Sequence, residues 1–206
     1  MSDKAPLPVV LYWHMHQPSY EDPIAHHYEA PWTYLHGIKD YVDMAAHLEG
    51  EPLARAVVNF TPTLLEQIAD YATQLTTAAG GRDGLRDPLL QALAGPVLPV
   101  DPRQRLILIQ AALRIDRVQV IERFAPYRRL ARLADWVVDH PAGLDYLSDQ
   151  FLIDLLVWYH LAWLGETVRR SDARAKSLIE KGAHYTLADR GMLIGLLAEL
   201  MASIIP

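Results

Sequence analysis

The sequence contains no cysteine among its 206 residues, which excludes disulfide bonds, thiolate metal ligands and cysteine nucleophiles. It has no basic excess either, because 19 Lys and Arg stand against 25 Asp and Glu, a formal net charge of -6. Nucleic acid and anionic membrane surfaces are therefore disfavoured as partners. No apolar run is long enough to span a membrane, and the first eight residues lack the pattern of a secretory signal. Since 51% of the residues are apolar, we expect a globular cytoplasmic protein with a substantial core.

Two short apolar runs predict β-strands. Residues 9–13 (VVLYW) stop at His14, and residues 55–60 (RAVVNF) stop at Thr61. Continuous runs of this kind are typical of strands buried on both faces of a parallel sheet. A Pro-bearing loop and a helical pattern over 34–49 lie between them. This order predicts a βαβ unit with parallel strands and a right-handed crossover.

The rest of the chain predicts helices. Thr61 and Thr63 are N-cap candidates for the first of them, and Glu66 is spaced to close a capping box with Thr63. We expect an α/β fold with two or three parallel strands and a large helix-rich segment. The predicted helices cover 63–75, 101–124, 127–138 and 151–169, and a last one, opened by Thr186 and Asp189, runs to residue 204.

The segment from His14 to Pro18 (HMHQP) is the strongest candidate for a functional site. Residues just past the carboxyl end of a parallel strand face the binding crevice, and alternate positions of an extended chain point the same way. Three interpretations of His14 and His16 stay open. They hydrogen-bond their own loop, or they bind a metal as in hydrolases of the amidohydrolase type, or they are neutral groups that bind sugar hydroxyls or orient a carboxylate. A metal site needs further ligands, and no strand-end histidine is readable after residue 60.

Two clusters of aromatic residues follow. Trp32 and Tyr34 stand in a segment (PWTYLHG, 31–37) predicted to belong to the loop after the first strand, where their rings could stack on sugars or pack as a core or lid. Trp158 and Trp163 stand in a predicted helix that is apolar on nearly every face, which favours burial over ligand binding.

Four segments of the chain resemble the amino-terminal part of family 57 glycoside hydrolases. His14, His16, Gln17 and Pro18 match the first short sequence region of that family, His-x-His-Gln-Pro. The same order continues with the later segments, so that the resemblance covers essentially the whole chain. The segments are LYWHMHQPSY (11–20), PWTYLHGIKDYVDMAAHLE (31–49), AVVNFTPTLLEQIADY (56–71) and DLLVWYHLAWLGE (154–166).

The resemblance implies a retaining α-glucan hydrolase, branching enzyme or glucanotransferase, built on a partial (β/α)7-type barrel of the glycoside hydrolase/deacetylase kind. It implies an α-glucan or oligosaccharide substrate, no cofactor and no metal. The family's nucleophilic Glu and acid/base Asp lie on later strands, and neither strand predicted here ends in a carboxylate. Retaining glycosidases need two carboxyl groups about 5 to 5.5 Å apart. The substrate-binding residues that the resemblance implies are His14, His16, Gln17, Trp32 and Tyr34.

We therefore expect residues 1–206 to form the single amino-terminal part of a catalytic barrel, with 1–61 as its βαβ portion and 62–206 as a mostly helical portion. Two strands cannot close a barrel, and the apolar stretch 201–206 is an unusual end for a domain. The catalytic pair is expected beyond residue 206, the chain alone is expected to be inactive, and the missing carboxy-terminal part of the barrel is an expected partner. Two other functions stay open, namely a metal-dependent hydrolase that uses His14 and His16, and a noncatalytic carbohydrate-binding or interaction module.

Overall fold

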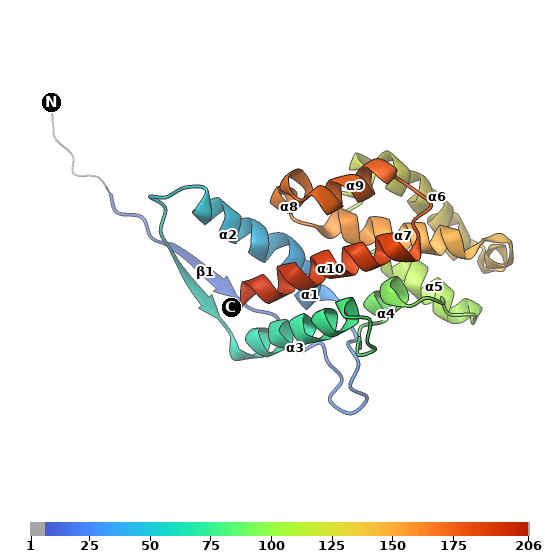
Figure 1. The fold of residues 1–206 in the computed structure, drawn as a ribbon, viewed down its shortest axis with the longest axis horizontal. Helices are drawn as coiled ribbons and strands as arrows, with labels where there is room; N and C mark the ends of the chain where they lie inside the picture. The colour runs from blue at the N-terminus through green and yellow to red at the C-terminus, as the bar shows by residue number, and fades with distance from the viewer. Residues whose placement is uncertain (1–6, 206) are drawn as a thin grey trace.

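A computed structural model describes residues 7–205, in which two parallel strands lie at one end of a large helical body (Figure 1). The α/β class with two parallel strands and a large helix-rich segment is thereby confirmed, while the partial (β/α)7-type barrel stays a prediction. The strands are β1 (Leu11–Met15) and β2 (Ala56–Phe60). The helices are α1 (Trp32–His36), α2 (Val42–Glu49), α3 (Pro62–Ala79), α4 (Pro88–Ala94), α5 (Pro102–Ala111), α6 (Ala125–Asp139), α7 (Asp149–Trp163), α8 (Glu166–Ser171), α9 (Ala173–Lys181) and α10 (Leu187–Ile204), with a π-helical turn η1 (Gly37–Tyr41) and 3-10 turns η2 (Ile121–Arg123) and η3 (Pro141–Tyr146).

Helices cover one face of the sheet and leave the other open. The strands pair residue by residue, so that Trp13 lies beside Val58 and Tyr12 beside Val57. Side chains alternate along a strand, and the face with Trp13 and Phe60 packs on the helical core. Tyr12 and Val57 point the opposite way and are 59% and 48% exposed. The prediction of strands buried on both faces is therefore wrong, because no second layer lies on this side in the described residues.

The crossover between the strands is helical from Trp32 to Glu49. Its middle part, η1, is π-helical, and the parts on either side, α1 and α2, are α-helical. It packs beneath the end of α10, and a Cβ on Gly37 would approach the Sδ of Met201 to 2.5 Å. The glycine therefore lets the two helices come close. The segment begins two residues earlier than predicted, which moves Trp32 out of the predicted loop.

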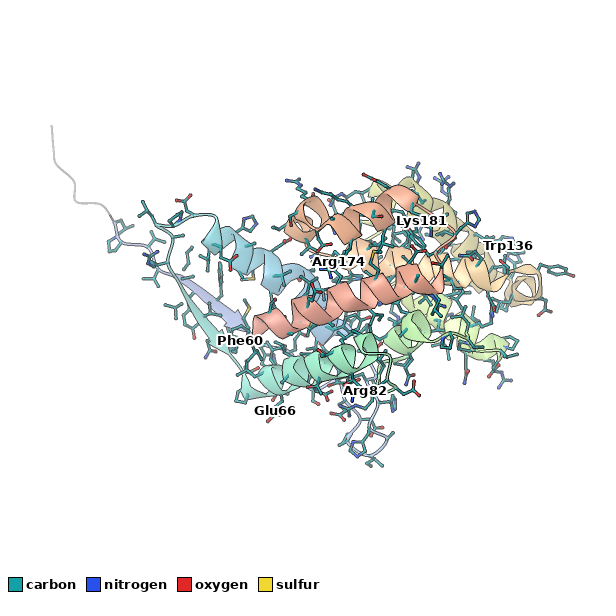
Figure 2. The ribbon with its side chains drawn as sticks, viewed as in Figure 1. Phe60, Glu66, Arg82, Trp136, Arg174 and Lys181 are labelled. Atoms are coloured by element: carbon teal, nitrogen blue, oxygen red, sulfur yellow. The ribbon has the colours of Figure 1, made fainter. Side chains whose placement is uncertain are left out.

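Helix α7 is the centre of the helical body. Its residues from Leu155 to Ala162 are all buried, as the sequence predicted for Trp158, and α3 and α10 run side by side across the molecule (Figures 1 and 2). Even so, no helix within residues 7–205 combines the length and the apolar character that crossing a membrane requires.

Several helix boundaries differ from those predicted. Helix α5 ends at Ala111 instead of near residue 124, and the following segment turns at Asp116, whose carboxylate accepts a hydrogen bond from the amide of Gln119 at 2.6 Å. The predicted capping box of Thr63 and Glu66 is wrong, because α3 begins after Thr61 without a side-chain cap. The box of Thr186 and Asp189 is confirmed.

The predicted helix over 151–169 is broken at Leu164 and Gly165, where α7 ends and α8 begins. The carboxylate of Asp43 in α2 accepts hydrogen bonds from the amides of Glu166 at 2.7 Å and Thr167 at 3.0 Å. The cap of α8 is therefore a residue more than 100 positions away in the sequence, which no local pattern could reveal.

One glycine substitution tests this cap, and a second, in α10, serves as its control. A Cβ on Gly165 would lie 2.6 Å from the Oδ1 of Asp43, so Gly165→Ala should displace the carboxylate and cost about 1–3 kcal/mol of unfolding free energy. Gly191 lies inside α10 with no atom within 4 Å of such a methyl group, so Gly191→Ala should stabilise by about 0.5–1 kcal/mol. Urea unfolding measures both changes. A stabilising Gly165→Ala would show that the Asp43 cap is dispensable.

Candidate functional site

The carboxyl ends of the two strands bring His14 and Asn59 together. They are register partners, and the Nδ1 of His14 lies 2.7 Å from the Oδ1 of Asn59. The strand runs on to Met15, so His14 belongs to the strand itself and not to the loop after it, which corrects the predicted boundary. The rings of His14 and His16 are nearly parallel, at 20°, with centroids 6.1 Å apart. The prediction that the two imidazoles share one side of the chain is confirmed.

This pair projects onto the open face of the sheet. His14 alternates with the helix-facing side chains of Trp13 and Met15, and both histidines and Asn59 are exposed. The side chains nearest the strand ends on this face are therefore hydrogen-bonding groups, whereas Val57, the preceding residue of β2 on the same face, is apolar. Such an arrangement can bind a ligand that carries hydroxyl groups.

The turn that carries His16 and Gln17 is held by helix α3. The Nε2 of Gln67 donates to the carbonyl of Pro18 at 2.9 Å, and its Oε1 accepts from the amide of Tyr20 at 3.1 Å. The hydroxyl of Tyr20 in turn donates to the Oε1 of Gln17 at 2.7 Å. Gln17 is therefore half-buried and engaged with the loop, apart from the open-face pair. Gln67 is buried, and its anchoring role had no signal in the sequence beyond a polar residue at a core position.

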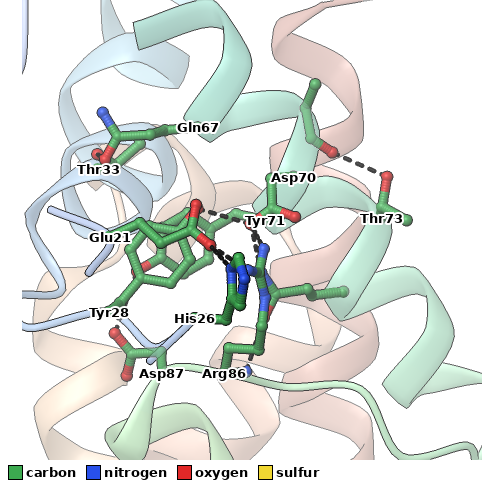
Figure 3. A network of polar contacts seen from close by, with 12 residues as sticks. Glu21, His26, Tyr28, Thr33, Gln67, Asp70, Tyr71, Thr73, Arg86 and Asp87 are labelled. Carbon is green, nitrogen blue, oxygen red and sulfur yellow. Dashed lines mark hydrogen bonds and ion pairs between the residues drawn. The ribbon is translucent and has the colours of Figure 1, made fainter. Parts of the chain in front are cut away.

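A network of charges fixes the loop between β1 and α1 (Figure 3). The guanidinium of Arg86 pairs with Glu21 in the loop and with Asp70 of α3, the latter at 2.5 Å, and the hydroxyl of Tyr28 donates to the Oδ2 of Asp70 at 2.6 Å. Burial, together with this hydrogen bond to Asp70, raises the pKa of Tyr28 well above its usual value. Glu21 is thus held in an ion pair that orders the loop, as Figure 3 shows from close by.

Two of the predicted sugar-binding residues lie elsewhere. Tyr34 is fully buried, and its hydroxyl donates to the Nε2 of His160 in α7 at 3.0 Å. Trp32 is half-buried against Trp163, with ring centroids 6.1 Å apart. The predicted loop position of Trp32 is wrong, because the helix already begins after Pro31, and Tyr34, which also stands in the predicted helical pattern over 34–49, turns into the core. Tyr34 therefore packs the core and does not join the open-face histidines.

Two buried ionisable groups lie in the same core. The ring of His160 donates from Nδ1 to the carbonyl of Leu156 at 2.7 Å, and burial lowers its pKa to about 4. The carboxylate of Asp87 caps α4 by accepting from the amide of Leu89 at 2.9 Å, and burial raises the pKa of Asp87 to about 6. Both groups are satisfied by internal hydrogen bonds and act in stability.

A metal site would need more ligands than the two histidines. Within residues 7–205, no three His, Asp or Glu side chains are grouped so that they could hold a metal ion. The strands end at Met15 and Phe60, so neither strand end of the described chain presents a carboxylate.

The comparisons with known proteins bear on the strand-bearing part of the chain. A search of curated proteins and a search of solved structures each found no match. The family model described as Glycosyl hydrolase family 57 matches residues 10–77, a range that holds both strands, the crossover helices, His14 and Asn59. Residues 10–77 are therefore similar to glycosyl hydrolase family 57, the family that the His-x-His-Gln-Pro segment had indicated.

Proposed function

We propose that this chain is the amino-terminal, substrate-binding part of a retaining glycoside hydrolase or transglycosidase that acts on α-glucans. The observation that carries the proposal is the position of His14 and His16, which project from a strand end onto the uncovered face of a parallel sheet. The match of residues 10–77 to the family supports the chemistry. Neutral imidazoles both donate and accept hydrogen bonds, as the hydroxyl groups of a sugar require.

The open face has the side-chain order of the inside of a barrel. In a (β/α) barrel, helices cover the outside, apolar side chains fill the inside, and functional side chains lie at the carboxyl ends of the strands. Tyr12 and Val57 stand where the filling would be, and His14 and Asn59 stand two residues closer to the carboxyl end. We infer that further parallel strands, from the carboxy-terminal part of the barrel, complete this face.

Those further strands would supply the two catalytic carboxyl groups. A retaining mechanism needs a nucleophile and an acid/base about 5 to 5.5 Å apart, and the described strand ends offer none. His14 and His16 would then hold the reacting sugar against that pair, and the isolated chain would bind oligosaccharide without cleaving it.

Calorimetric titration with maltoheptaose tests this function. We expect the wild-type chain to bind the sugar with no release of reducing ends, and His14→Ala and His16→Ala each to weaken binding about tenfold, since each removes hydrogen bonds to hydroxyl groups. Trp136→Ala is the matched control, because Trp136 is exposed at the opposite end of the molecule from Phe60 (Figure 2). Equal binding by all four proteins would contradict the placement of the site, and turnover by the isolated chain would contradict the missing catalytic pair.

A further inference from the structure

We infer that Asn59 is a positioning residue that fixes the tautomer of His14, so that the Nε2 of His14 faces the ligand as a hydrogen-bond acceptor. The identity of the ligand as a sugar rests on the proposed function. The tautomer itself does not, because it follows from the contact between these two side chains.

The contact defines where the ring proton lies. The atom of Asn59 that faces the ring is the carbonyl Oδ1, 2.7 Å from the Nδ1 of His14. An amide oxygen only accepts hydrogen bonds, so Nδ1 must carry the proton. A neutral imidazole has one N–H group, and Nε2 is then left with its lone pair.

The sheet holds the two side chains at this distance. His14 and Asn59 are direct partners in the register, and each stands between two side chains of the helix-facing side. The ladder continues past them, since the amide of Thr61 donates to the carbonyl of Met15 at 3.1 Å. The ring of His16, 6.1 Å away and nearly parallel, lies beside that of His14. The strands therefore set the relative position of His14 and Asn59.

This tautomer selects the kind of group that can face His14. A lone pair on Nε2 accepts a hydrogen bond, so the ligand atom at this position must be a donor. A sugar hydroxyl meets this requirement, whereas the oxygen of a carboxylate, a phosphate diester or a carbonyl does not. Asn59 would thus make one subsite of the proposed sugar site specific for a free hydroxyl group.

Nuclear magnetic resonance of protein labelled with 15N in its histidines tests the tautomer directly. We expect the Nδ1 of His14 to give the shift of a protonated ring nitrogen and Nε2 that of an unprotonated one. In Asn59→Leu, which is isosteric but has no acceptor, His14 should revert to the Nε2–H tautomer that free histidine prefers. Asn59→Asp keeps the acceptor oxygen and should keep Nδ1 protonated. The His16 resonances serve as an internal reference. An Nε2–H tautomer in the wild type, or no change in Asn59→Leu, would overturn the inference.

A binding experiment then separates the tautomer from the function. Asn59→Leu should bind maltoheptaose about tenfold more weakly than the wild type, and Asn59→Asp should retain most of the affinity. If the tautomer depends on Asn59 but neither the wild type nor any variant binds the sugar, the proposed function is refuted while the effect of Asn59 on the tautomer stands. If the sugar binds equally well to Asn59→Leu while the tautomer changes, the selective role of Nε2 is refuted. A stoichiometric shift of the Nε2 resonances of both histidines by Zn²⁺ would likewise refute it in favour of a metal ligand.

Discussion

Replacing Trp158 with Ala is expected to lower the free energy of unfolding by about 3–5 kcal/mol. The side chain is 1% exposed at the middle of α7, and its ring lies 5.5 Å from that of Phe124. Its Nε1 donates to the carbonyl of Gly182 at 2.8 Å. Gly182 has a φ of 74°, in the left-handed region that favours glycine, and it ends α9. The substitution therefore leaves both a cavity and an unsatisfied carbonyl at a helix end.

Urea unfolding followed by circular dichroism measures this loss. Trp158→Phe keeps most of the ring volume and removes only the hydrogen bond, so it should cost about 1–2 kcal/mol. Trp136→Ala removes the same side chain from a position that is 49% exposed and should cost about 1 kcal/mol or less. Equal losses for Trp158→Ala and Trp136→Ala would show that α7 is not the centre of the cooperative core.

Replacing Asp87 with Asn is expected to change how stability depends on pH. Burial raises the pKa of Asp87 from an ordinary 3.8 to about 6. The favourable contribution of protonated Asp87 to the free energy of unfolding is therefore fully present below pH 3.8 and is lost as the pH rises to about 6. Burial lowers the pKa of His160 from an ordinary 6.5 to about 4. The favourable contribution of neutral His160 to the free energy of unfolding is therefore fully present above pH 6.5 and is lost as the pH falls to about 4. Each shift corresponds to about 3 kcal/mol, and the two oppose each other across nearly the same range.

The opposing effects of Asp87 and His160 should therefore leave the unfolding free energy of the wild type nearly independent of pH between pH 4 and pH 6.5. In Asp87→Asn only the His160 contribution remains, so its unfolding free energy should rise by about 3 kcal/mol more than that of the wild type over this range. Urea unfolding at pH 4, 5.5 and 7 gives the difference, in which groups common to both proteins cancel. Asp101→Asn is the control, since Asp101 is also an N-cap before a proline but is exposed. A variant that follows the wild type at all three values of pH would show that Asp87 is charged and stabilised in the fold.

Local patterns predicted those parts of the fold that local interactions determine. The βαβ order, the burial of α7 and the capping box at Thr186 all follow from residues close together in the sequence. Helices α4 and α9 were missed although Asp87 and Asp172 cap them, and those two Asp residues were the available signal. The break at Gly165 depends on Asp43, a contact that exists only in the folded chain.

The residues of the candidate site also fall into those that a local pattern predicts and those whose place depends on contacts distant in the sequence. His14 and His16 stand in a short motif, and extended geometry alone places them on one side. Asn59 was missed because its pairing with His14 depends on strand register, which links residues 45 positions apart. Trp32 was assigned to a loop because the helix that starts there carries no side-chain cap, so no local signal marked its beginning.

The placement of the crossover helix links the fold of the amino-terminal range to that of the helical body. Tyr34 needs His160 as its partner, the carbonyl of Ile38 accepts from the amide of Gly165 at 2.9 Å, and Gly37 lies against Met201. The family-matching range 10–77 therefore does not close its own core. The crossover helix that leads from His14 to Asn59 is held in place by residues as far along the chain as Met201, so the fold of the family-matching range depends on the helical portion.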